Sequence, residues 1–166
     1  MMGDMTSVLR RMTPGDLDAL LSVQREGARV ALGHIFSQGR HPFPTETVRE
    51  RWSQEIASPD ADCFMVLGPA GEVAGFAATR GSEFLHFGTA LHSWGSGLAG
   101  RAHDEVLSHL RAQGHRQGWL RVFEENRRAR RFYERRGWVV TGERSTTPFA
   151  PHPVLLKYVI NLDPAR

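Results

Sequence analysis

The chain of 166 residues has a single cysteine, a single lysine and no long apolar run. Cys63 cannot form an internal disulfide, and a lone cysteine fits a reducing compartment such as the cytoplasm. It lies in the apolar run 63–67, which favours burial over a role as a nucleophile. No stretch approaches the roughly 20 apolar residues that span a bilayer, and residues 1–11 lack the apolar core of a signal peptide. We therefore expect a cytoplasmic protein with no membrane partner.

The chain also lacks a strong excess of either charge, because its acidic and basic residues nearly balance to a formal net charge of +3. Lys157 is the only lysine among 21 basic residues, so arginine supplies nearly all the positive charge. A mild excess of this kind does not by itself indicate a nucleic-acid partner. The length and the 40% apolar fraction suit one domain with a real core, spanning residues 1–166.

Apolar periodicity and turn residues predict an α/β domain with a mixed, mostly antiparallel sheet of about seven strands and four flanking helices. The expected order is β-α-α-β-β-β-α-β-α-β-β. The predicted strands are residues 7–11, 63–67, 72–79, 83–91, 119–123, 138–142 and 154–162. The predicted helices are residues 14–31, 45–57, 97–113 and 126–136, with residues 33–44 as a loop.

A glycine-rich segment, residues 95–100, joins the predicted strand 83–91 to the predicted helix 97–113. Glycines let the backbone turn tightly and bring N–H groups close to a ligand, and the positive end of a helix dipole favours phosphate. Read as Gly-x-Gly-x-x-Gly, the segment matches a dinucleotide-binding pattern. That pattern needs an acidic residue about 20 positions later, and residues 115–121 contain none. We therefore expect a phosphorylated cofactor other than a dinucleotide.

Two separate segments, residues 92–97 and 126–138, match a different pattern. The first, His92-Ser93-Trp94-Gly95-Ser96-Gly97, resembles motif A of the GNAT superfamily of N-acetyltransferases, Gln/Arg-x-x-Gly-x-Gly/Ala, with His92 departing from the usual residue. The second, residues 126–138, resembles the family's Asn-x-x-Ala-x-x-Phe-Tyr-x-x-x-Gly-Phe block. The element order also resembles the GNAT fold from residue 7 to residue 162.

The resemblance implies acetyl-CoA as the cofactor. Backbone N–H groups of the glycine-rich segment would bind its pyrophosphate, and the end of strand 83–91 would pair with its pantetheine arm. Asn126 would contact the same arm where two strands separate. The cofactor-binding residues implied in this way are Phe87, Gly88, Thr89, Gly95, Ser96, Gly97, Leu98, Ala99, Gly100 and Asn126.

Acetyl transfer to an amine needs an acid for the departing thiolate and a base for the amine. Tyr133 stands where the family places the acid, and a tyrosine O–H can donate to a thiolate. Glu83 matches the position of the glutamate base in some members, and His86 is its competitor. Strand alternation puts Glu83 and Phe87 on one face and His86 on the other unless a bulge intervenes. The backbone of strand 83–91 would polarise the thioester carbonyl.

Six arginines crowd the predicted helix 126–136. A nucleic-acid surface is one interpretation. The favoured one is a solvated face, because Ala129, Phe132 and Tyr133 form the inward stripe of this helix.

The acceptor region of this fold is rich in charged residues here, and positive groups outnumber acids among Arg25, Glu26, Arg29, His34, Arg40, His41, Arg144 and His152. Like charges repel in a dry cleft, so we expect a small-molecule amine that carries an anionic or neutral group, or a peptide N-terminus, rather than a polyamine. No histidine pair has metal-ligand spacing, and we expect no metal. Many relatives dimerise, so a homodimer is an expected assembly. A non-catalytic acyl-CoA-binding or interaction module is the alternative function, and a dinucleotide-binding enzyme is a third, disfavoured one.

Overall fold

The structure is a computed structural model that describes residues 6–37 and 39–163, and a seven-stranded sheet runs through it. The strand order is β1-β2-β3-β4-β5-β7-β6, with β4 and β5 parallel and the other neighbours antiparallel. This confirms the predicted mixed sheet. The strands are β1 (Leu9–Arg11), β2 (Ala61–Leu67), β3 (Val73–Arg80), β4 (Glu83–Thr89), β5 (Gln117–Phe123), β6 (Val139–Thr146) and β7 (Val154–Asn161).

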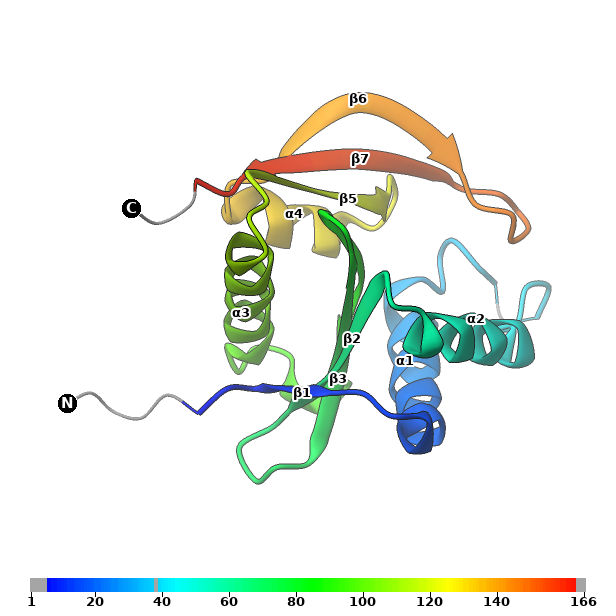
Figure 1. Cartoon of the computed structure of the whole chain (residues 1–166). Helices are drawn as coiled ribbons and strands as arrows, with labels where there is room; N and C mark the ends of the chain where they lie inside the picture. Colours follow the sequence, from blue (N-terminus) through cyan, green and yellow to red (C-terminus); the bar gives the residue numbers. More distant parts are fainter. Residues whose placement is uncertain (1–5, 38, 164–166) are drawn as a thin grey trace.

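Four α-helices in the described part of the chain cover the two faces of the sheet (Figure 1). They are α1 (Leu17–Ala31), α2 (Thr45–Ala57), α3 (Leu98–Ala112) and α4 (Arg127–Arg135), with short 3-10 turns at Pro14–Asp16 and Leu91–Ser93. The second turn ends β4 two residues before the expected strand end. No helix in the described ranges has the length and apolar character needed to cross a bilayer.

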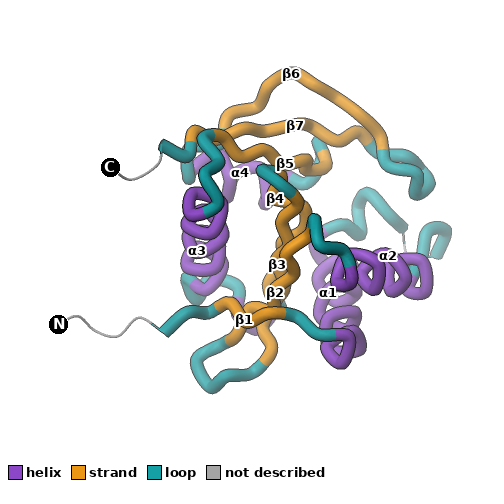
Figure 2. The backbone as a smooth tube through the Cα atoms, viewed as in Figure 1, coloured by secondary structure: helices purple, strands orange, loops and turns teal. Residues whose placement is uncertain are grey.

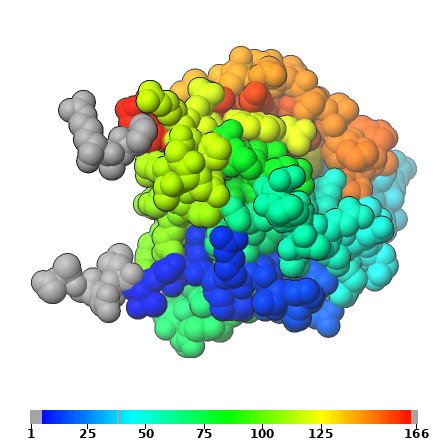
Figure 3. Space-filling view, in the orientation of Figure 1, coloured from blue at the N-terminus to red at the C-terminus, as the bar shows by residue number. Residues whose placement is uncertain are grey.

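The two faces have separate cores. Helices α1 and α2 pack Leu20, Leu21 and Trp52 against one face, whereas α3 and α4 pack against the other. Full burial of a side chain such as Leu20 contributes about 1.5–3 kcal/mol. Side chains fill the space that the ribbons leave between α3 and the sheet (Figure 3). The sheet is therefore held rigidly from both sides.

The sheet splits between β4 and β5. Their register consists of the single parallel pair Glu83 and Trp119, beyond which the strands diverge (Figure 2). Antiparallel pairing continues on both outer sides, β4 with β3 and β5 with β7. The split leaves a slot lined by the backbone of β4.

A bulge in β4 changes which side chains share a face. Phe84 lies opposite Thr79 and His86 lies opposite Ala78, so Leu85 is an extra residue. Phe84 and Phe87 both pack on the side of α3 and α4, whereas His86 contacts Trp52 of α2. Alternation from Phe84 puts Glu83 on the face of His86. The unbulged alternation, with Glu83 and Phe87 together, is therefore wrong.

His103 is a buried histidine on α3, and it is 1% exposed. The Trp138 indole donates to its Nε2 at 3.0 Å, and its Nδ1 lies 2.9 Å from the exposed Asp104 carboxylate. An indole N–H can only donate, so Nε2 is unprotonated and the ring is neutral. Burial lowers the pKa of His103, and the hydrogen bond that its Nδ1–H donates to Asp104 opposes this shift.

This lowered pKa predicts acid sensitivity. Below about pH 6.5 the histidine is protonated in the unfolded chain but stays neutral in the folded protein. The free energy of unfolding therefore decreases as the pH falls. Urea unfolding at about pH 7.5 and about pH 5.5 should show a steeper loss for the wild type than for His103→Gln, which has no group titrating in this range. Equal losses in the two proteins would contradict the assignment.

Candidate active site

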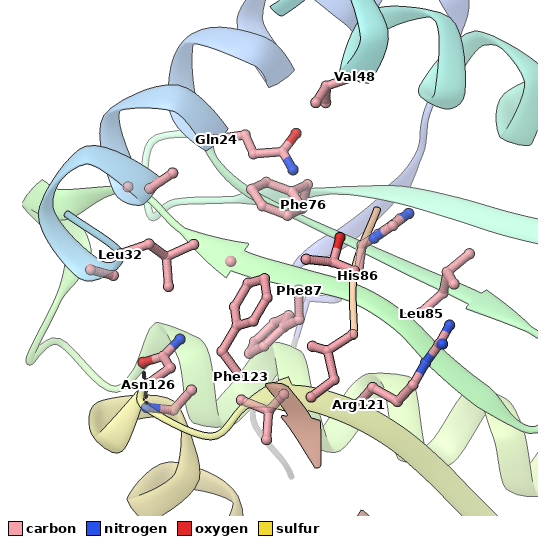
Figure 4. Close-up of a pocket in the computed structure, with 18 of the residues that line it drawn as sticks. Gln24, Leu32, Val48, Phe76, Leu85, His86, Phe87, Arg121, Phe123 and Asn126 are labelled. Carbon is pink, nitrogen blue, oxygen red and sulfur yellow. Dashed lines mark hydrogen bonds between the residues drawn. The ribbon is translucent and has the colours of Figure 1, made fainter. Parts of the chain in front are cut away.

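A cavity of about 1060 Å³ lies between α1, α2, the slot beside β4, and α4 (Figure 4). It is closed on one side by residues 146–150, which precede β7. Sequence-predicted site residues that line it are Glu83, Phe87, Gly88, Thr89, Ala99, Asn126 and Tyr133. Gly95, Ser96, Gly97, Leu98 and Gly100 are outside this lining, around the start of α3. One continuous space thus connects the head of α3 with Glu83.

The glycine-rich segment turns the chain into α3. Gly95 and Gly97 adopt φ values of +82° and +89°, a region that side chains disfavour. Leu98 is the first helical residue, and its side chain is buried in the core. Ser96 Oγ accepts from the Leu98 N–H at 3.3 Å, and Gly97, which precedes the helix, has no side chain that could cap it. The Arg136 guanidinium lies close to Gly100, so the helix head combines the N–H groups of its first turn with positive charge.

Trp94 contacts the last residue of β4 and lines the cavity. Its indole donates to the Thr89 carbonyl at 3.0 Å. The Arg128 guanidinium carbon lies over the Trp94 ring, 3.8 Å from the ring centroid. Thr89 is one of the residues expected to pair with the cofactor. A cofactor N–H that pairs with this carbonyl would share it with the Trp94 indole, because a carbonyl oxygen has two lone pairs.

Asn126 has a structural role. Its Oδ1 accepts from the Ala129 N–H at 3.2 Å and caps α4. This leaves the amide nitrogen for a ligand, because the residue also lines the cavity. The family-like asparagine thus begins the helix that carries Tyr133.

Tyr133 is buried on α4 among aromatic rings, 8% exposed, with Phe132 at 5.3 Å and Trp138 at 5.9 Å between ring centroids. No described residue hydrogen-bonds its hydroxyl, although the residue lines the cavity. Burial raises the pKa of Tyr133. The phenol is therefore kept neutral, with its proton available to a ligand.

Two carboxylates reach the other end of the cavity, and each has a cationic neighbour. Glu83 lies 3.5 Å from Arg121. Glu55 of α2 is buried, 2.9 Å from His86 Nε2 and 3.3 Å from Arg80. The His86 ring also packs against the Trp52 ring in a tilted arrangement, with 4.7 Å between the ring centroids.

Glu55 was missed as a site residue from the sequence. Glu55 lies three positions after Trp52, on the buried face of α2. A carboxylate on an otherwise apolar helix face is unusual, and this could have indicated a functional residue from the sequence. Of the cations expected near the acceptor, His41 lines the cavity and the others do not. Arg29 pairs with Glu26 on the surface, and Arg144 pairs with Glu124.

The arginines of α4 form a mostly solvated face, as predicted. Arg130 is the half-buried exception, donating to the Tyr158 hydroxyl at 2.9 Å and to the Glu124 carbonyl at 3.0 Å. Within residues 6–37 and 39–163, no cluster of three or more His, Cys, Asp or Glu residues is arranged to hold a metal ion.

Comparisons with known proteins agree with this geometry. A family model described as the acetyltransferase (GNAT) family matches residues 29–138. A search of curated proteins gave no significant match. A GCN5-related N-acetyltransferase from Rhodopseudomonas palustris superposes with a TM-score of 0.75 at 15% identity, covering 97% of this chain and 99% of that one. The spermidine N-acetyltransferase of Vibrio cholerae, in complex with CoA and spermine, has a TM-score of 0.71 at 17% identity, covering 94% and 95%. At such identities these structures show a shared fold.

Proposed function

The chain belongs to the GNAT family of acetyltransferases, and from this premise we propose that it transfers an acetyl group from acetyl-CoA to a primary amine. The amine belongs to a small molecule or a peptide N-terminus. The observation that supports this most directly is the continuous cavity from the head of α3, past Tyr133, to Glu83. A cofactor bound by its pyrophosphate at α3 would run its arm along β4 and present its thioester near the middle of this cavity.

In this proposal the amine nitrogen attacks the thioester carbonyl directly. Glu83 accepts a proton from the amine, and a β4 backbone N–H polarises the carbonyl oxygen. When the C–S bond breaks, Tyr133 donates its proton to the CoA thiolate. Both proton transfers use groups that line the one cavity.

Ligand-dependent stabilisation tests the cofactor. A ligand present at 100 times its Kd, and bound only by the native state, adds about 2.7 kcal/mol of stability. For a domain of this size that should raise Tm by about 5–10 °C. We expect this shift with acetyl-CoA and not with NAD or NADP. A larger shift with either dinucleotide would overturn the proposal in favour of the dinucleotide interpretation.

A non-catalytic acyl-CoA-binding module remains distinguishable by turnover. Such a module would show the shift in Tm without releasing CoA in the presence of any amine. CoA release that depends on an added amine, measured by thiol titration, supports the transferase.

A further inference from the structure

The far end of the cavity contains a glutamine whose orientation is fixed by a neighbour. Gln24 on α1 faces Trp52 on α2, and the Trp52 Nε1 atom lies 2.8 Å from Gln24 Oε1. Trp52 is 1% exposed, so its ring is immobilised by the core. Both residues line the cavity.

The chemistry of the indole decides which end of the amide turns inward. An indole N–H can donate but cannot accept, so it must face the amide oxygen and not the NH₂ group. The oxygen of Gln24 is thus engaged, and the NH₂ group points toward Phe76 and the interior of the cavity (Figure 4). None of the described residues accepts a hydrogen bond from this NH₂ group. Gln24 therefore offers two fixed donors to a ligand.

Charges that line the same cavity favour an anion. Glu55 is compensated by His86 and Arg80, and Glu83 by Arg121. Arg51 also lines the cavity, 5.6 Å from the Phe149 ring centroid, with no carboxylate partner among the described residues. The cavity thus presents a surplus of positive charge and no unpaired carboxylate within the described ranges.

On the premise of the acetyl transfer proposed above, we propose that this end of the cavity binds the acceptor through a carboxylate. The acceptor is then a primary amine that carries a carboxylate group on an apolar chain. Gln24, held by Trp52, is the residue that selects this group, and Arg51 supplies the countercharge. The apolar chain would lie against Trp52, Phe76 and Phe149, which also line the cavity.

A polyamine is disfavoured by the same geometry. Its distal ammonium group would meet the NH₂ donors of Gln24 and the cation of Arg51, and like charges brought together disfavour binding. This distinguishes the cavity from one built for spermidine, although the Vibrio cholerae spermidine N-acetyltransferase shares the fold.

The test compares three acceptor series that differ only in the distal group. These are ω-amino acids from aminobutyrate to aminohexanoate, diamines of equal length, and alkylamines of equal length. At the best chain length we expect kcat/KM for the ω-amino acid to exceed kcat/KM for the diamine and for the alkylamine of equal length by about 10-fold or more. Equal rates for ω-amino acids and alkylamines, or the highest rates for diamines, would overturn the assignment.

Two variants tie the preference to Gln24. Gln24→Glu keeps an oxygen for the indole but puts a carboxylate in place of the NH₂ group, so the ω-amino acid should lose its advantage by about 10-fold or more while diamines gain. Trp52→Phe removes the indole donor that fixes the Gln24 amide, so the preference for ω-amino acids over alkylamines and diamines should weaken. Gln117→Glu, the same substitution at an exposed position on β5, should leave the profile unchanged. An unchanged profile in Gln24→Glu would refute the role of this residue.

Acceptor binding without turnover separates this inference from the proposed function. Thermal shifts are measured for each acceptor in the presence of CoA. Shifts by ω-amino acids with no acetyl transfer would uphold the carboxylate subsite and overturn the transferase. Acetylation with diamines preferred would uphold the transferase and overturn the subsite.

Discussion

Tyr133→Phe is expected to lower kcat by about 10²–10⁴-fold, the range of effect for a general acid, while the Kd for acetyl-CoA stays within about twofold. The substitution removes only the hydroxyl, and no described residue depends on that hydroxyl for a hydrogen bond. The ring packing with Phe132 and Trp138 is retained. Steady-state rates and acetyl-CoA titrations of both proteins measure the two quantities.

Burial decides how this acid depends on pH. Because burial raises the pKa of Tyr133 above the ordinary value of about 10, its ionisation should cause no loss of activity below about pH 10. A higher pKa alone would make a weaker acid. The thiolate formed in the same buried space is also destabilised by desolvation, which raises its affinity for the proton. The higher proton affinity of the buried thiolate thus offsets the higher pKa of the buried phenol.

Tyr158 provides the matched control, because the chain has only two tyrosines. Its hydroxyl donates to Glu134 at 2.6 Å and accepts from Arg130. Tyr158→Phe should therefore lower stability by about 1–2 kcal/mol and leave kcat nearly unchanged. A loss of kcat in Tyr158→Phe as large as that in Tyr133→Phe would show that the effect is structural.

The parts of the site that the sequence predicted are local in the chain. Glycines that need positive φ, such as Gly95 and Gly97, leave a readable pattern before a helix. Asn126 and Tyr133 lie within two turns of each other, so their spacing alone places them at one helix. The element order was predicted for the same reason, since periodicity and turn residues act over short distances.

The parts that the sequence did not predict depend on packing between distant elements. The bulge at Leu85 follows from how β3 and β4 align, and it moves Glu83 to the face of His86. The contact between Gln24 and Trp52 joins residues 28 positions apart, and that between Glu55 and His86 joins residues 31 apart. Both require α2 to lie over the sheet, and no spacing rule within one helix specifies that.

Glu83→Gln should lower kcat/KM at neutral pH by about 10²–10³-fold if this residue is the base. The position of Glu83 favours its role as the base. The slot runs from Thr89, near the head of α3, to Glu83, where β4 and β5 still pair. An arm anchored at α3 would bring its thioester toward the Glu83 end. The loss should shrink at higher pH, where more of the acceptor amine is already deprotonated and no base is needed.

His86→Gln is the comparison, because glutamine retains an N–H for Glu55 but has no group that titrates near neutral pH. His86 is held between Glu55 and the Trp52 ring, which suits it to shape the cavity wall. We expect His86→Gln to lose less than about 10-fold and to keep the pH profile of the wild type. If His86→Gln instead abolished the pH dependence while Glu83→Gln remained active, the proton acceptor would be the imidazole. Glu55 would then be the residue that orients it.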